Sequence, residues 1–123
     1  MFDFTLPPIN LYTIGKRKYM LNTLANEILE INRNNGWNVT TPEDWFENDY
    51  KIPAILALIT SETSEALEAF RKRDSNNFAE ECADQIIRVL DLTAGLGIDI
   101  DYQIKKKLEK NKTRGYRHGN KRV

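Results

Sequence analysis

The chain has 123 residues, 41% of them hydrophobic and 29% charged, with only six Gly and four Pro. This composition excludes collagen-like, low-complexity and disordered chains and leaves an ordinary folded protein. The net charge is zero, but residues 105–123 hold nine Lys or Arg against one Glu, so this tail carries +8 and residues 1–104 carry −8. Such a tail attracts phosphate-rich ligands, nucleic acid or the acidic body of the same protein, and charge alone does not choose among them.

Membrane insertion and disulfide bonding are not expected from this sequence. No stretch approaches the roughly 18 consecutive apolar residues of a membrane span, and the start, MFDFTLPPIN, lacks the basic and apolar regions of a secretion signal. Cys82 is the single cysteine, so the chain can form neither an internal disulfide nor a Cys/His zinc site. We therefore expect a cytoplasmic protein with one domain over residues 1–123, a helical core over about 17–112 and a basic tail over 113–123.

The first predicted helix and a short second one lie before the middle of the chain. Residues 17–33 carry apolar side chains at the spacing of one helical face, which predicts a helix that ends at the break of residues 34–36. These side chains are Met20, Leu24, Ile28 and Ile31. The sequence TPED at residues 41–44 has Pro at a first helical position and an acid beyond the cap. It predicts a short helix through Trp45 and Phe46.

A long helix is predicted next. Pro53 can open it, and it runs to about Arg73. Residues 74–77 are poor helix formers and predict a loop. Asn77 and Glu80 then have the spacing of a capping pair, which predicts the start of the following helix.

That following helix carries residues 78–96 and is expected to stop at Gly95 and Gly97, since glycine suits a helix C-terminus. A last helix is predicted over about 101–112. No apolar alternation of period two has a useful length, so the sequence gives little case for a sheet. We predict an all-α fold, an antiparallel bundle of about four helices with a basic C-terminal extension.

Two acids of the long helix break its amphipathic pattern. On a wheel of about 100° per residue, Glu62 and Glu65 fall in the same arc as apolar side chains. Those side chains are Ile55, Leu58, Ile59, Ala66 and Ala69. A carboxylate removed from water is strongly destabilised unless a partner neutralises it. We therefore expect a metal, another cation or a proton beside Glu62 and Glu65.

The following helix carries a polar stripe, formed by Glu81, Asp84, Arg88 and Asp91. The opposite side carries Cys82, Ile86, Val89 and Leu90, so an ordinary solvated face is also compatible with this spacing. The short loop makes the two helices an antiparallel pair, so the carboxylates of both can converge. Glu62, Glu65, Glu81 and Asp84 would then supply the oxygen ligands that Mg²⁺ prefers.

Three stretches stand in a specific order: SETSEALEAF, NFAEECADQIIRVLDL and KLEKNKTRGYRHGNKR. Together they resemble the MazG-like family of all-α nucleotide pyrophosphohydrolases, over roughly residues 55–122. The family pattern ExxE falls on Glu62 and Glu65, and the pattern ExxD falls on Glu81 and Asp84. The later pattern of Lys, Asn and Arg falls on Lys107, Asn111 and Arg114.

The resemblance implies hydrolysis of a nucleoside triphosphate between its α- and β-phosphates, which gives a monophosphate and pyrophosphate. The four acids would hold Mg²⁺, with Mn²⁺ as a possible substitute, and Glu62 or Glu65 would serve as general base. The phosphates would meet basic and amide side chains, with Arg suited to bidentate contact. These side chains are Lys107, Asn111, Arg114 and Arg117.

Two further residues are candidates for substrate binding. Trp37 follows the break after the first helix and could stack a base, although a role as a packing anchor fits equally well. Arg88 stands where some relatives carry an aromatic residue, which leaves the preferred base open. It could contact a phosphate, or pair with Asp84 or Asp91.

Other functions remain open at this point. A related all-α dUTP hydrolase or phosphoribosyl-ATP pyrophosphohydrolase would share the site and differ in substrate. A non-catalytic helical module could instead bind nucleic acid or protein through the basic tail. We favour the enzyme, because a basic tail does not explain Glu62 and Glu65 within an apolar stripe, and we expect no membrane or nucleic-acid partner. The short chain and the family resemblance predict a homodimer or homotetramer.

Overall fold

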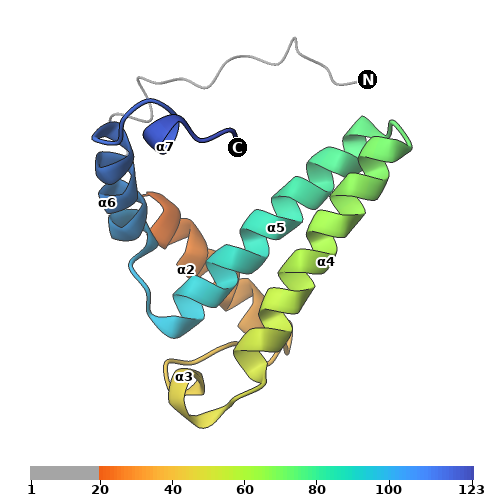
Figure 1. Cartoon of the computed structure of the whole chain (residues 1–123). Helices are drawn as coiled ribbons and strands as arrows, with labels where there is room; N and C mark the ends of the chain where they lie inside the picture. The colour runs from red at the N-terminus through yellow and green to blue at the C-terminus, as the bar shows by residue number, and fades with distance from the viewer. Residues whose placement is uncertain (1–19) are drawn as a thin grey trace.

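The computed structural model describes residues 20–123, and within this range it contains helices and no strand (Figure 1). The predicted all-α class is therefore confirmed. None of the described helices is long and apolar enough to cross a membrane. The helices are α2 (Met20–Asn34), α3 (Asp44–Glu47), α4 (Lys51–Arg71), α5 (Ser75–Leu96), α6 (Ile100–Lys112) and α7 (Arg117–Asn120).

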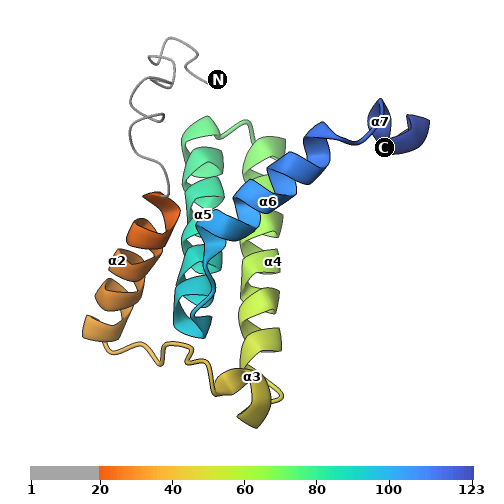
Figure 2. The ribbon, with the colours of Figure 1, turned by 90° about the vertical axis from the view of Figure 1, so that its left-hand side faces the viewer.

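A long antiparallel hairpin, α4 and α5, forms one side of the molecule, and α5 lies between α4 and α2 (Figure 2). Ala66 and Ala69 of α4 are buried, and their small side chains allow close helix packing. The helix α6 packs mainly against α2. The end of the hairpin that carries the α4–α5 loop therefore has no covering helix from the described chain (Figure 1).

The hydrophobic core lies where α2 meets α5 and α6. Ala25, Ile28 and Leu90 are buried there. Leu21, Ala94 and Ile100 are partly buried around them. Two members of the apolar spacing that predicted the first helix, Leu24 and Ile31, are exposed by 43% and 51%. The observed helix starts at Met20, and the predicted residues 17–19 lie outside the described part.

The start of α4 differs from the prediction. The helix begins at Lys51, so Pro53 stands in its first turn. Proline is tolerated there because the first backbone N–H groups of a helix have no partner within the helix. The residue therefore marks the first turn and not the first residue.

The start of α5 was predicted at the wrong residue. Asp74 is the cap, since its side chain accepts a hydrogen bond from the backbone N–H of Asn77. The helix begins at Ser75, so Asn77 and Glu80 both lie inside it. Asp and Asn cap helices about equally well, and the sequence alone did not choose between Asp74 and Asn77.

The two glycines near the end of α5 have different roles. Gly97 is the C-cap with a left-handed φ of 75°, as predicted. Gly95 lies inside the helix and is buried against Thr40. A Cβ at Gly95 would lie 2.5 Å from the carbonyl oxygen of Thr40, so this glycine is required for close packing and does not end the helix.

Beyond α5, the helix α6 begins at Ile100 with Asp99 as its cap and ends at Lys112. The short α7 was not predicted, because residues 113–123 were expected only as a basic tail. Its residues Arg117 and His118 have left-handed φ values of 50° and 49°, which residues other than glycine rarely adopt.

Candidate metal centre

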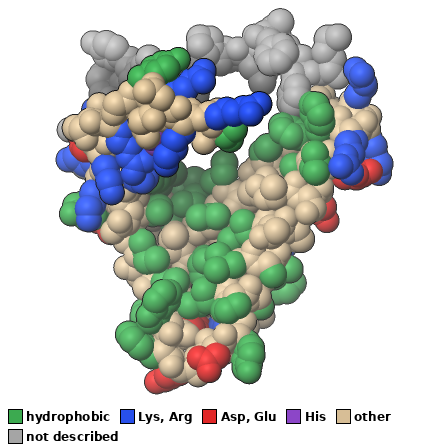
Figure 3. All heavy atoms as spheres, viewed as in Figure 1, with side chains coloured by type: hydrophobic (Ala, Val, Ile, Leu, Met, Phe, Trp, Pro, Cys, Tyr) green, Lys and Arg blue, Asp and Glu red, His purple; other side chains and the backbone are tan. Residues whose placement is uncertain are grey.

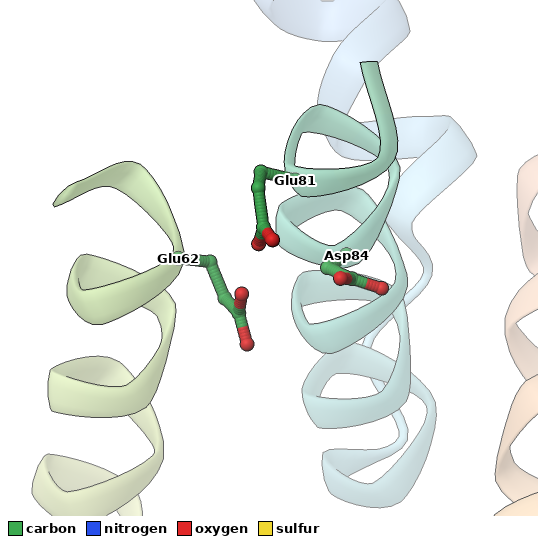
Figure 4. A group of neighbouring side chains, drawn as sticks. All are labelled: Glu62, Glu81 and Asp84. Carbon is green, nitrogen blue, oxygen red and sulfur yellow. The ribbon is translucent and has the colours of Figure 1, made fainter. Parts of the chain in front are cut away.

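Three carboxylates from the hairpin lie close to one another, and those of Glu62 and Glu81 extend into the space between α4 and α5 (Figure 4). Glu62 comes from α4, and Glu81 and Asp84 come from successive turns of α5. One oxygen of each side chain lies within 4.8 Å of the others. We call these three residues the acidic cluster.

The three acids differ in burial. Glu62 is 8% exposed, Glu81 is half-buried and Asp84 is exposed. The Oε2 atom of Glu81 is buried, and no donor group within residues 20–123 hydrogen-bonds to it. A buried oxygen without a partner is destabilising unless a proton or a cation completes its environment. The donor set, carboxylate oxygens with open access to solvent at Asp84, fits the preference of Mg²⁺.

The cluster shifts the acidity of its members in opposite directions. A hydrogen bond with Glu62, followed by burial and the proximity of Glu65, raises the pKa of Glu81 to about 7. The hydrogen bond with Glu81 and that from Arg88 lower the pKa of Glu62, against the effect of burial. Below about pH 7 the pair therefore holds one proton, which resides mainly on Glu81.

Arg88 supplies a positive charge to the same group. Its Nε donates a hydrogen bond to Glu62 Oε1 at 2.9 Å. The sequence left Arg88 open to pairing with Asp84 or Asp91, and the structure shows that it pairs across the hairpin with Glu62 instead. Asp91 accepts a hydrogen bond from Asn32 of α2 at 3.0 Å.

A family model described as MazG nucleotide pyrophosphohydrolase domain matches residues 51–118 of this chain, which is more than half of it. The chain belongs to this family. A search of curated proteins and a search of solved structures each give no match. The matched MazG domain contains α4, α5 and α6, and with them the whole acidic cluster.

Glu65 was expected to join the cluster, and it lies beside the three acids of that group. Its side chain is exposed and is not part of the group of mutually close oxygens. Its hydrogen bonding still contributes to the pKa of both Glu62 and Glu81. Leu58, placed on the same edge of the predicted arc, is also 47% exposed. The buried arc of α4 is therefore narrower than the wheel suggested.

The polar stripe of α5 is not an ordinary solvated face. Glu81 and Arg88 are half-buried against α4. Two apolar residues predicted on the opposite side, Ile86 and Val89, are instead 58% and 38% exposed. Within the MazG domain, the hairpin buries part of its acids and exposes part of its apolar surface.

The predicted phosphate-binding residues lie apart from the acidic cluster. Lys107 and Asn111 are exposed on α6, and Arg114 follows its end. None of these three residues forms a hydrogen bond or ion pair with the cluster among the described residues; Arg114 contacts His118 at 3.0 Å. Figure 3 shows Lys and Arg side chains gathered over α6 and α7, across a hollow from the upper part of the hairpin. Arg117 stacks over the ring of Tyr116 at 5.4 Å.

Trp37 is also distant from the cluster within one copy of the chain. It is 71% exposed, in the loop that precedes α3. The loop lies beside the first turn of α4, because Lys51 Nζ donates to Val39 O at 2.9 Å. From Lys51 to Glu62 the helix rises roughly 16 Å. Trp37 also precedes the segment matched to the MazG domain.

Proposed function

We propose that this MazG-domain protein is a Mg²⁺-dependent pyrophosphohydrolase that cleaves a nucleoside or deoxynucleoside triphosphate between the α- and β-phosphates. The products would be the monophosphate and pyrophosphate. The observation that carries this proposal is the acidic cluster within the segment that matches the family model. In this cluster the buried Oε2 of Glu81 accepts no hydrogen bond from the described part of the chain. Neighbouring acids that are partly buried and have too few hydrogen-bond donors favour a cation site over a purely structural one.

Glu62, Glu81 and Asp84 would hold the ion, with Mn²⁺ able to replace Mg²⁺. The bound ion would neutralise phosphate charge and lower the pKa of the attacking water. Glu65 is our candidate for the general base in preference to Glu62. Its carboxylate is exposed beside the cluster and is not part of it, whereas Glu62 is buried and bonded to Arg88. Glu65 would accept the proton that the water loses.

The phosphates would be bound by Lys107, Asn111 and Arg114, with Arg117 as a further donor, whereas Arg88 is bonded to Glu62. Lys107 and Asn111 stand at i and i+4, so they share one side of α6. Arg114 lies two residues beyond the end of that helix, so the shared face does not extend to it. The first three side chains are exposed and are not engaged with the cluster, which leaves their donors available for phosphate oxygens. Trp37 is proposed to stack the base, because its ring is largely exposed.

We further propose that the active form is a homodimer or homotetramer. Leu56, Leu67 and Phe70 form an apolar stripe along α4, and they are 50%, 51% and 65% exposed. Exposed apolar side chains on one helix face are typical of an interface between chains. Assembly would also bring the exposed basic residues and Trp37 of one copy to the acidic cluster of another. A monomeric mass in solution would contradict this part of the proposal.

The first test is release of pyrophosphate against orthophosphate from a panel of canonical and modified NTPs and dNTPs, with Mg²⁺ and with EDTA. We expect pyrophosphate that depends on Mg²⁺, and the panel then ranks the bases. Preference for dUTP or for phosphoribosyl-ATP would assign the chain to one of those related activities. No turnover of any nucleotide, together with binding to nucleic acid or protein that weakens steeply with salt and needs no Mg²⁺, would favour the non-catalytic module instead.

A further inference from the structure

Arg88 and Glu62 form an ion pair across the hairpin. The two residues lie on different helices of the hairpin, and the guanidinium reaches across to a carboxylate that is almost entirely shielded. The side chain of Glu62 is 10% exposed and that of Arg88 is 39% exposed. Only one of the two carboxylate oxygens, Oε1, accepts this hydrogen bond.

We propose that Arg88 is a positioning residue that orients the Glu62 carboxylate for metal binding. The proposal rests on the metal-binding role assigned above to the acidic cluster. By fixing Oε1, Arg88 restricts rotation of the carboxylate and leaves its second oxygen for the cluster. Partners that orient a ligating carboxylate in this way typically contribute about 10–100-fold to metal affinity.

A purely electrostatic role for Arg88 predicts the opposite effect on metal binding. Arg88 brings a positive charge next to the place where a cation would bind, so its removal would make the cluster more attractive to that cation. Its loss as an orienting partner would make binding weaker, because Glu62 would have to be ordered by the ion itself. The sign of the change in affinity therefore separates the two roles.

Direct Mn²⁺ binding tests the proposal without any nucleotide. Free Mn²⁺ would be measured by its electron paramagnetic resonance signal in titrations of wild type, Arg88→Gln and Arg88→Lys. We expect Arg88→Gln to bind about tenfold more weakly. Arg88→Lys should lie between it and wild type, since lysine keeps the charge but lacks the planar donor geometry. Equal or tighter binding by Arg88→Gln, or no Mn²⁺ binding by wild type, would overturn the proposal.

Arg71→Gln is the matched control. Arg71 belongs to the same hairpin and pairs with Glu68 at 3.7 Å, and both side chains are exposed. The substitution removes one positive charge without touching the cluster, so Mn²⁺ affinity should stay at the wild-type value. Circular dichroism of each variant reports folding. If Arg88→Gln does not fold, the comparison of Arg88→Lys with wild type decides, and equal affinities would overturn the proposal.

A kinetic measurement separates positioning from direct contact with substrate. If Arg88 acts through Glu62, Arg88→Lys should raise the Mg²⁺ concentration needed for half-maximal rate and leave the nucleotide KM at saturating Mg²⁺ unchanged. A raised nucleotide KM with unchanged Mn²⁺ affinity would make Arg88 a substrate-binding residue and overturn the proposal. Absence of pyrophosphate release by wild type that still binds Mn²⁺ would instead contradict the proposed enzymatic function alone.

Discussion

Glu62 and Asp101 are buried to the same extent, each 8% exposed, yet their surroundings differ. Asp101 stands in the first turn of α6, and its two oxygens accept hydrogen bonds from the backbone N–H groups of Leu21 at 3.1 Å and Asn22 at 3.0 Å. These donors belong to the first turn of α2, where backbone N–H groups have no partner within the helix. Both oxygens of this buried carboxylate thus accept hydrogen bonds from backbone donors of the same chain.

Glu62 is surrounded by other acids. Glu81 and Asp84 approach it, and the buried Oε2 of Glu81 accepts no hydrogen bond from residues 20–123. Arg88 offsets part of the charge, and the raised pKa of Glu81 offsets another part through a retained proton. Burial of a carboxylate therefore does not identify a cation site. What distinguishes the two residues is whether the chain itself supplies enough donors.

The largest expected effect concerns the acidic cluster. Asp84→Asn removes one ligand charge at an exposed position, so we expect hydrolysis to fall by at least about a hundredfold. The thermal midpoint should stay at or above the wild-type value, since repulsion among the acids decreases. Pyrophosphate release and thermal unfolding would be measured together.

Glu80→Gln is the control for this variant, because Glu80 is an exposed acid next to Glu81 and outside the cluster. It should keep wild-type activity. Full activity in Asp84→Asn would remove Asp84 from the proposed site. Equal losses in both variants would point to general electrostatic attraction rather than to a ligand.

Asp101 should behave in the opposite way. Asp101→Ala leaves two backbone N–H groups of α2 without their acceptor, so we expect a loss of about 1–3 kcal/mol in the free energy of unfolding. Denaturant titration would measure it. Mn²⁺ affinity of the folded variant should not change.

A conservative variant sharpens this expectation. Asp101→Asn keeps one oxygen acceptor and should lose less stability than Asp101→Ala. If Asp101→Ala were as stable as wild type, the capping role would be wrong. If it lost metal binding while folded, the distinction between the two buried acids would fail.

Much of the fold follows from the sequence, because helices with a 3.6-residue apolar period are strong local signals. The helix ends are harder to predict. Asp74 and Asn77 are both good caps, and the choice depends on how the hairpin closes. From the sequence alone, Gly95 predicts a helix end. Its actual role depends on Thr40, which lies more than fifty positions earlier in the chain and packs against it.

The candidate site shows the same limit. Glu62, Glu81 and Asp84 could be grouped in advance together with Glu65, because helical spacing and a short connecting loop are local features. Which of the four acids lie closest depends on how α4 and α5 pack. The partner of Arg88 could not, since it depends on which turn of α4 stands opposite. Asp101 gave no signal, because its partners are backbone groups about eighty residues away along the chain.

The smallest expected effect is the pH dependence of the stability of the metal-free protein and of its Mn²⁺ affinity. Glu81 has a pKa raised from 4.5 to about 7, so it stabilises the metal-free protein fully below pH 4.5 and loses that contribution as pH rises through about 7. The lowered pKa of Glu62 has the opposite sign, since its contribution is present above 4.5 and is lost as pH falls through its lowered value.

Metal binding must displace the proton on Glu81, so apparent Mn²⁺ affinity should rise about tenfold between roughly pH 6 and pH 8. Titrations at several pH values would measure the change, and calorimetry in buffers of different ionisation enthalpy would count the released proton. In Glu81→Gln the residual affinity should lose this dependence, because no carboxyl remains there to titrate. Asp101→Asn should keep it, because Asp101 is already bonded to fixed backbone donors and takes no part in the proton shared by Glu62 and Glu81. A wild-type Mn²⁺ affinity that does not change over this pH range would mean that the metal does not displace a proton from Glu81. Burial of the cluster would then be structural, as it is for Asp101, and would not indicate a cation site.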